Sequence, residues 1–300
     1  MRVFLTGATG FIGSRIVPEL IGAGHSVLGL TRSNTGAQAL RQAGAEVHQG
    51  TLEEPDSLAR GAAQADAVIH TAFDHDFSNF AANCEKDRCV IAAMGEALRG
   101  SDRPLVITSG TGMGILAPGQ LASEEVTNLE HPNPRVASEM ASVALLDAGV
   151  NVSVVRLPQV HDPVKQGLIT PLVAIARAKR LAAYVGEGLN RWPAAHVLDV
   201  ARLYRLALER GLPGVRYNAV AEEGIAVRDI TAAIGHGLDV PVASISAEQA
   251  ADYYGWMAIF ASLDMPASSA KTREWLNWNP TGPGLLADLA AMDYAATTDS

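Results

Sequence analysis

Three glycines near the N-terminus constrain the fold more than any other feature of this sequence. Gly7, Gly10 and Gly13 stand three residues apart, directly after the apolar run Val3–Leu5. Apolar residues then recur at helical spacing, and a second apolar run follows at 26–30. A strand, a glycine turn, a helix and a second strand within about thirty residues are typical of a βαβ unit that binds a dinucleotide. The pyrophosphate of such a ligand lies at the helix N-terminus.

Short apolar runs alternate with alanine-rich segments of helical periodicity through the first half of the chain. The pattern predicts further strands at residues 45–48, 67–70, 104–108 and 152–156. Two of the expected helices lie at residues 80–99 and 135–148. Such alternation indicates the α/β class, in the form of a Rossmann-type doubly wound parallel sheet with helices on both faces.

The regular alternation ends near residue 157, where prolines begin to interrupt shorter elements. We therefore expect a smaller C-terminal substrate lobe beside the sheet. Residues 1–160 are predicted to form the dinucleotide-binding domain, to which residues 190–220 return. Residues 161–189 and 221–290 are predicted to form the lobe.

The composition excludes several classes of protein. A formal net charge of −9 argues against a surface for nucleic acid or for an anionic membrane. Cys84 and Cys89 are too few for a disulfide scaffold, and neither a signal peptide nor a bilayer-spanning apolar run is evident. The segment 74–76 resembles a metal site only superficially, because two carboxylates and a histidine also suit a solvated loop, so no metal is expected. We predict a cytoplasmic protein that acts on a small molecule, without nucleic-acid or membrane partners.

Six short segments along nearly the whole chain share their pattern with one family. They are residues 7–13, 66–72, 106–110, 155–158, 192–201 and 276–280. Through these segments the chain resembles a short-chain dehydrogenase/reductase of the extended or atypical branch, the NAD-dependent epimerase/dehydratase family. The resemblance implies a Rossmann fold, a bound nicotinamide dinucleotide and redox chemistry at carbon.

The glycine turn, the expected strand ends and the resemblance together assign the residues that bind the cofactor. They are Gly7, Thr9, Gly10, Phe11, Ile12, Gly13, Thr31, Arg32, Ser33, Thr51, Leu52, Thr71, Ala72, Phe73, Leu157 and Pro158.

The residues after the second strand indicate which dinucleotide is bound. An acidic side chain there would accept hydrogen bonds from the ribose 2′-hydroxyl of NAD and repel a 2′-phosphate. This chain has Thr31-Arg32-Ser33 instead. A guanidinium grips a phosphate bidentately and stacks on adenine, so Arg32 favours NADP over NAD unless it is only a solvated loop residue. Thr51 and Leu52 stand where the family often has an acidic residue that contacts adenine.

The catalytic pair of the family is missing. Reductases of the family use a tyrosine with a lysine four residues later on one helical face, and none of the six tyrosines here has that partner. Arg135 and Glu139 stand at the matching place. They are either an ion pair of the helix surface or, if Arg135 takes part in the reaction, the source of a fixed positive charge. An arginine does not give up its proton at neutral pH.

Two hydroxyls and two ionisable groups remain as catalytic candidates. Ser109, or else Thr111, follows the fifth strand and could orient a carbonyl or merely stabilise a turn. His161, tuned by Asp162 or water, could donate a proton near neutral pH. Lys165 could hold an anion or act itself if desolvated. The alternatives are a satisfied turn histidine and a solvated lysine.

Other polar and aromatic residues have weaker assignments. His70 at the end of the fourth strand is interpreted as structural. The resemblance implies that residues 190–192 and His196 reach the substrate from the lobe. An aromatic group is interpreted as the lobe's core, with a substrate wall as the alternative; it comprises Tyr253, Tyr254, Trp256, Met257 and Phe260.

These observations predict an NADP-dependent oxidoreductase, an atypical short-chain reductase that transfers hydride to a carbonyl or related double bond of a small organic molecule. An NAD-dependent sugar-nucleotide epimerase or dehydratase is the alternative enzyme. Because the tyrosine–lysine pair is missing, a dinucleotide-binding regulator without turnover is a third hypothesis. The family often dimerises through the helices represented by 80–99 and 135–148. Their alanines fit either a homodimer or burial within a monomer.

Overall fold

The computed structural model describes residues 1–117 and 119–295. Its larger part is a seven-stranded sheet in the order β10-β6-β5-β4-β1-β2-β3, and every neighbouring pair is parallel. The strands are β1 (Arg2–Thr6), β2 (Ser26–Thr31), β3 (Glu46–Gln49), β4 (Ala67–His70), β5 (Leu105–Gly110), β6 (Val152–Leu157) and β10 (Arg216–Asn218). The predicted Rossmann-type doubly wound sheet is confirmed.

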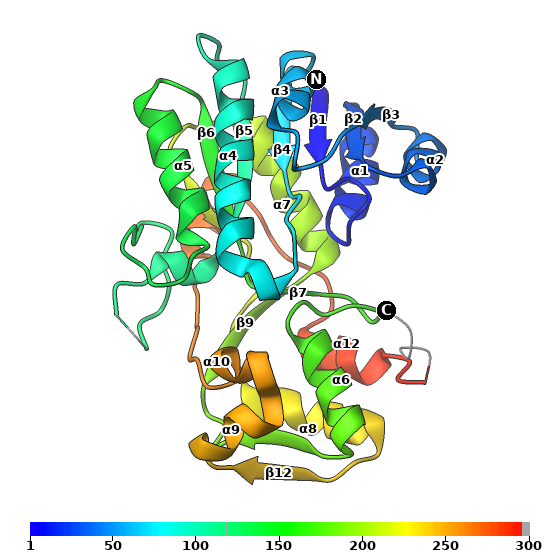
Figure 1. Ribbon diagram of the computed structural model, residues 1–300, viewed down its shortest axis with the longest axis vertical. Helices are drawn as coiled ribbons and strands as arrows, with labels where there is room; N and C mark the ends of the chain where they lie inside the picture. Colours follow the sequence, from blue (N-terminus) through cyan, green and yellow to red (C-terminus); the bar gives the residue numbers. More distant parts are fainter. Residues whose placement is uncertain (118, 296–300) are drawn as a thin grey trace.

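Helices cover both faces of this sheet because successive strand side chains point to opposite sides. In β1, Val3 and Leu5 belong to one apolar core and Phe4 to the other. The first core is covered by α1 (Gly13–Gly22) and α7 (Val197–Arg210), and the second by α3 (Pro55–Ala63), α4 (Phe80–Leu98) and α5 (Val136–Asp147) (Figure 1). Another helix of this half, α2 (Asn34–Gln42), packs beside β2 and β3.

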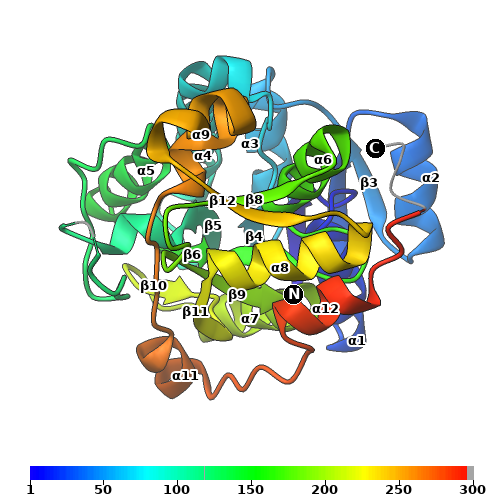
Figure 2. The same cartoon turned by 90° about the horizontal axis from the view of Figure 1, so that it is seen from below.

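A smaller lobe lies below the sheet in Figure 1 and has a core of its own, which includes Trp192, Met257 and Leu285. Its elements are α6 (Ile169–Lys179), β8 (Ala182–Val185), α8 (Val227–Leu238), β12 (Val242–Ile245), α9 (Ala247–Tyr254), η3 (Gly255–Met257), α10 (Ala258–Ala261) and α12 (Leu285–Ala291). Seen from below, the parallel pair β8 and β12 lies among α6, α8 and α9 (Figure 2).

A three-stranded sheet joins the two parts. It has the order β11-β9-β7, formed by β7 (Gln159–His161), β9 (Arg191–His196) and β11 (Glu222–Ala226). Because β9 leads directly into α7, the chain returns here from the lobe to the large sheet. Near the end of the chain, α11 (Ala270–Leu276) packs against α7 and β10, and Trp278 lies in the sheet's core. Residues 270–278 therefore pack on the half of the molecule that contains the large sheet.

The strand order reverses direction between β1 and β4, which lie side by side although the helix after β1 leads to β2. In open α/β sheets, ligands bind outside the carboxyl ends of the strands at such a switch point. Two 3₁₀ turns, η1 (Phe77–Asn79) and η2 (Thr111–Gly114), follow the ends of β4 and β5. Within the described residues, no helix is both long and apolar enough to cross a membrane.

Candidate functional site

The glycine turn after β1 leaves no room for a side chain at Gly7 or Gly13. Gly7 has φ +69°, and a Cβ there would lie 2.7 Å from Thr71 Oγ1 and 2.8 Å from the backbone nitrogen of Ala72. At Gly13 a Cβ would lie only 2.0 Å from the carbonyl oxygen of Gly7, so the helix packs on the turn without room for a side chain. At Gly10 a Cβ would lie 3.2 Å from the Gly7 carbonyl oxygen, which is a tight contact, and no other heavy atom would lie within 4 Å of it.

The switch point brings this turn against the residues that follow β4. Thr71 Oγ1 donates to the carbonyl of Thr6 at 2.8 Å, and the Ala72 N–H donates to Thr6 Oγ1 at 3.3 Å. The segment Thr71–Phe73 is half-buried. Leu157 and Pro158, two strands away at the end of β6, are also half-buried. The predicted cofactor residues from β1, β4 and β6 thus all follow carboxyl ends of strands, on one edge of the sheet.

The end of β2 offers one unpaired cation. Ser33 Oγ caps α2 by accepting from the Gly36 N–H at 3.0 Å, so its hydroxyl stabilises the turn. Arg32 is exposed and makes no hydrogen bond or ion pair among the described residues. The pKa of Asp74 is lowered mainly by the hydrogen bond from Lys86, and the charge of Arg32 adds to this effect. Arg32 therefore lies within electrostatic range of Asp74. Lys86 also pairs with Glu53 at 2.9 Å, so Arg32 is the unpaired one of the two cations.

Arg135 lies beside the site, with its guanidinium held by three groups. Nη1 donates to Asp87 Oδ2 at 2.6 Å and to Ser138 Oγ at 2.8 Å, and Nη2 donates to the carbonyl of Thr108 at 3.0 Å. Its Cζ lies 4.1 Å above the ring centre of Phe73. The surface ion pair with Glu139 is therefore wrong. Arg135 precedes the first residue of α5 and turns toward α4, so the spacing rule for helix faces does not apply to it.

Asp87 is the hub of a buried polar chain. It accepts from Arg135, from Ser138 Oγ at 2.7 Å and from His70 Nε2 at 2.9 Å, while His70 Nδ1 bonds Thr6 Oγ1 at 2.6 Å. Burial by itself raises the pKa of Asp87, but the charge of Arg135 and the hydrogen bonds outweigh it and hold this pKa well below its usual range. The carboxylate is therefore ionised and fixes Arg135 in place. His70 is structural in this chain of contacts, since both its ring nitrogens are bonded.

Glu139 pairs with a strand rather than with its own helix. Its two carboxylate oxygens face Arg156 Nε at 2.8 Å and Arg216 Nε at 3.4 Å. Arg156 is fully buried and also donates to the carbonyls of Ser123 and Val126. Arg156 thus joins the segment after η2 to β6, and Glu139 compensates its buried charge. No local pattern in the sequence predicts this role, because the partners come from separate parts of the chain.

Ser109 has an unused hydroxyl at the same edge of the sheet. Thr108 Oγ1 contacts Tyr204 OH of α7 at 2.6 Å, so strand alternation places Ser109 on the opposite face, where Asp87 and Arg135 lie. The Ser109 side chain is buried, and its Oγ has no hydrogen-bond partner among the described residues. A buried hydroxyl without a partner is costly unless a ligand or water satisfies it. Thr111, the second candidate, is buried in η2.

His161 lies in a different polar group, where β7 meets α12. Its Nδ1 bonds Asp288 Oδ2 at 2.6 Å, its ring centre lies 5.8 Å from that of His196, and its buried Nε2 has no partner among the described residues. Burial lowers the pKa of His161 although the hydrogen bond to Asp288 opposes this. The contacts of His161 are not with Ser109, Thr111 or Arg135.

Lys165 is exposed, and no acceptor for its ammonium group lies among the described residues. The backbone N–H of Lys165 donates to Asp162 Oδ1 at 2.9 Å, and this hydrogen bond closes the turn. Burial, together with the charges of Arg135 and then Lys165, lowers the pKa of His75. Lys165 and Arg135 therefore both lie within electrostatic range of His75, in the loop that follows β4.

The lobe residues expected to reach the substrate make structural contacts. Arg191 pairs with Asp264 at 2.9 Å, Trp192 is fully buried, and His196 Nδ1 caps α7 by accepting from the Leu198 N–H. Asn190 donates to backbone carbonyls near α10.

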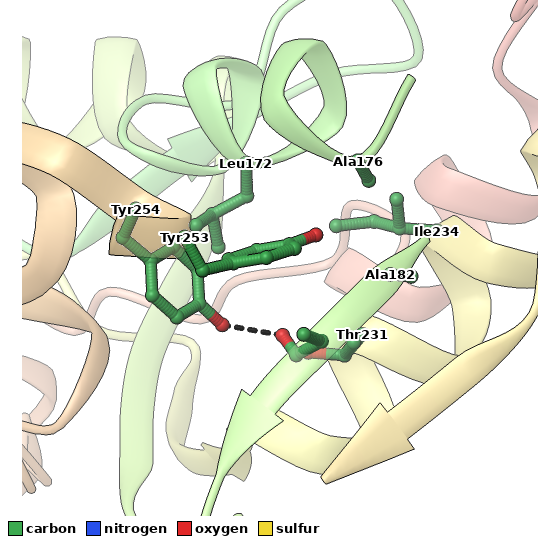
Figure 3. Close-up of a pocket in the computed structure, with 8 residues that line it drawn as sticks. Leu172, Ala176, Ala182, Thr231, Ile234, Tyr253 and Tyr254 are labelled. Atoms are coloured by element: carbon green, nitrogen blue, oxygen red, sulfur yellow. Dashed lines mark hydrogen bonds between the residues drawn. The ribbon is translucent and has the colours of Figure 1, made fainter. Parts of the chain in front are cut away.

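The aromatic residues of the lobe divide into buried and exposed members. The hydroxyls of Tyr253 and Tyr254 donate to the carbonyls of Leu181 and Ala183, and these rings line a cavity of about 10 Å³ (Figure 3). Such a cavity holds at most about one water, so it is part of the lobe's core and cannot take a substrate. Trp256, in contrast, is 48% exposed and stacks on Phe77.

The fold and this site define a dinucleotide-binding Rossmann protein. A family model described as "NAD dependent epimerase/dehydratase family" matches residues 3–219. The chain belongs to the NAD-dependent epimerase/dehydratase family, whose members bind a nicotinamide dinucleotide. The expected resemblance is confirmed.

Three similar proteins illustrate the range of the family. "Uncharacterized protein C2A9.02" of Schizosaccharomyces pombe (strain 972 / ATCC 24843) is 45% identical, with 98% of this chain and 100% of that protein covered. A "4-hydroxy-2-methyl-3-oxo-4-farnesyl-3,4-dihydroquinoline-1-oxide ketoreductase" of Stigmatella aurantiaca is 27% identical over 89% of this chain and 84% of its own length. The UDP-glucose 4-epimerase of Thermus thermophilus in complex with NAD superposes with a TM-score of 0.74 at 21% identity, covering 99% and 100% of the two chains. That last likeness concerns the fold alone.

Proposed function

We propose that this protein is an NADP-dependent reductase that transfers hydride to a carbonyl or related double bond of a small organic molecule. The bound dinucleotide supplies the hydride. The chain would hold it through the glycine turn and the residues after β2, β4 and β6. Ser109 would orient the substrate oxygen, and Arg135 would provide a fixed positive charge beside it.

The position of Arg135 carries this proposal. A guanidinium anchored by Asp87 and Thr108 can stabilise an oxyanion that develops during reduction, because it needs no reorganisation at that moment. It cannot exchange a proton at neutral pH. An epimerase must remove a proton from an alcohol and later return one, which calls for a group with a pKa near neutrality. The site therefore favours one-way reduction over epimerisation, although the family contains both kinds of enzyme.

The proton needed to complete the reduction would come from solvent. His161 is fully buried and bonded to Asp288, and it makes no contact with the residues proposed to meet the substrate. Lys165 is exposed to water near the loop after β4, so it can attract an anion but is not enclosed in a site that would place it against a substrate. Neither is needed as the proton donor.

The decisive experiment follows nicotinamide absorbance with NADPH and a panel of aldehydes, ketones and enones, in parallel with UDP-glucose and NAD. The proposal expects NADPH oxidation with at least one carbonyl compound and no interconversion of the nucleotide sugar. Epimerised UDP-glucose without NADPH oxidation would make the alternative enzyme correct. Tight NADPH binding without turnover on any compound would favour the regulator.

Arg32 is proposed to select NADP by gripping the 2′-phosphate. Changing Arg32 to aspartate should weaken NADPH binding about 10- to 100-fold, the equivalent of losing charge-assisted hydrogen bonds of about 1.5–3 kcal/mol, and should improve NADH binding. Calorimetric titration with both cofactors measures this. Arg41→Asp, an equal change of charge at an exposed position of α2, is the control and should leave the preference unchanged. Equal affinity of the unmutated protein for both cofactors would contradict the assignment.

His161→Ala is predicted to affect stability more than catalysis. Asp288 would lose its buried partner, which costs about 1–3 kcal/mol. Because the folded-state pKa of His161 is lowered, its contribution to stability is present above an unfolded-state pKa of about 6.5 and is lost as the pH falls below it. The variant should therefore show a flatter loss of stability below about pH 6.5 in urea titrations. A large fall in kcat for the folded variant would instead restore His161 as the proton donor.

A further inference from the structure

One edge of the Arg135 guanidinium has no acceptor within the described part of the chain. Three of its five N–H groups donate hydrogen bonds, to Asp87, to Ser138 Oγ and to the carbonyl of Thr108. The Nε–H and the second Nη2–H make no hydrogen bond among the described residues, and the side chain retains 14% exposure. Paired N–H groups of this kind match the two oxygens of a carboxylate.

Two further cationic or protonatable groups, His75 and Lys165, lie in or near the loop after β4 that carries Phe73. The ring centre of His75 is 5.3 Å from that of Phe73, the ring that Arg135 covers at 4.1 Å. Arg135 and Lys165 both act electrostatically on His75, and Lys165 has no partner of its own among the described residues. The nearby carboxylates are already occupied. Asp74 pairs with Lys86 at 2.9 Å. In Asp162, one oxygen closes its own turn and the other faces Arg15 at 3.5 Å.

The surface next to Arg135 is aromatic. Phe77 stacks on Trp256 with ring centres 4.8 Å apart, which joins the loop after β4 to the lobe. On the loop side, the ring centres of Phe73 and Phe80 are 6.1 Å apart. In the lobe, the ring centres of Phe260 and Trp256 are 6.3 Å apart. We call Phe73, Phe77, Phe80, Trp256 and Phe260 the aromatic cluster. Rings of this kind bury flat apolar groups and leave charge recognition to the neighbouring cation.

We propose that the substrate is a small carboxylate with a flat apolar body, in which the carboxylate lies next to the reducible bond. The free edge of Arg135 would hold the carboxylate, Lys165 would add attraction, and the aromatic cluster would contact the body of the molecule. Adjacency follows because the reacting oxygen, which Ser109 would orient, must lie next to the same guanidinium charge whose free N–H groups hold the carboxylate. This inference rests on the proposed reductase function and specifies its substrate class.

Equilibrium binding of two matched probes tests the inference without turnover. Phenylpyruvate and its neutral analogue phenylacetone would be titrated calorimetrically into the full-length protein, both alone and with saturating NADP⁺. We expect phenylpyruvate to bind at least about 10-fold more tightly, the equivalent of one charge-assisted contact. Arg135→Gln should abolish this preference, Arg135→Lys should retain part of it, and Lys165→Gln should reduce it a few-fold. Equal binding of the two probes to the unmutated protein would overturn the inference.

A matched control separates this site from general charge. Arg99→Gln removes an exposed arginine that pairs with Glu96 on α4, so the preference for phenylpyruvate should persist in it. A preference that also persists in a folded Arg135→Gln variant would refute the assignment. NADPH binding measured on the same samples distinguishes the two proposals. Absent NADPH binding refutes the reductase function, whereas intact NADPH binding without any preference for the carboxylate refutes only the substrate class.

Discussion

Replacing Arg135 with glutamine is expected to lower kcat about 100-fold while leaving the affinity for NADPH unchanged. The guanidinium contacts Phe73 and the end of β5, beside the place where the reacting oxygen would lie, whereas Arg32, which is proposed to select the cofactor, follows the end of β2. Removing a fixed charge that acts on a developing oxyanion should therefore lower kcat and leave the affinity for NADPH unchanged. Steady-state kinetics on the carbonyl compound identified in the screen, with NADPH titration alongside, measure both quantities.

Asp87→Asn tests whether the position of Arg135 matters as well as its charge. The variant keeps the guanidinium but removes the carboxylate that fixes it and that also accepts from His70 and Ser138. We expect kcat to fall by at least about 10-fold, with partial loss of stability. Arg99→Gln should leave kcat unchanged, since its ion pair is exposed. Unaltered kcat in both Arg135→Gln and Asp87→Asn would remove Arg135 from the reaction.

Glu139→Gln is expected to cause the largest loss of stability among the substitutions considered. Glu139 and Arg156 are both fully buried, and Arg216 adds a second positive charge to the same carboxylate. Removing the carboxylate leaves buried cations without compensation, which typically costs about 3–5 kcal/mol. The free energy of unfolding in urea, followed by circular dichroism, gives the value.

The same substitution at an exposed glutamate provides the comparison. Glu96 pairs with Arg99 on the surface of α4, where both side chains are more than half exposed. Glu96→Gln should change the free energy of unfolding by less than about 1 kcal/mol. A similarly small effect of Glu139→Gln would mean that water or a local rearrangement satisfies Arg156, and that Glu139 is not needed to compensate its buried charge.

The dinucleotide-binding half of the fold could be predicted because its signals are local. The φ of Gly7 and the close packing at Gly13 follow from the spacing of glycines after an apolar run. Apolar runs separated by helical segments likewise specify a parallel sheet, whatever the distant residues are. The missing tyrosine–lysine pair is also visible in the sequence alone, since it needs only a four-residue spacing.

The partners of the charged residues could not be predicted in the same way. Four-residue spacing suggested that Arg135 pairs with Glu139. Arg135 instead precedes α5 and bonds Asp87, 48 residues earlier, while Glu139 points to β6. His161 similarly finds Asp288 at a separation of 127 residues. Such pairs form where the packing of helices and strands brings distant parts of the chain side by side.

Local sequence signals specify the glycine turn and the alternation that builds the sheet, and they show that no tyrosine is followed by a lysine four residues later. These properties depend on backbone conformation and on side chains within one or two helical turns. The tertiary structure alone decided that Arg135 is anchored beside the site, that Glu139 compensates the buried charge of Arg156 and that His161 lies among other residues. Burial and charge pairing arise from elements packed side by side, and this proximity is a property of the folded chain.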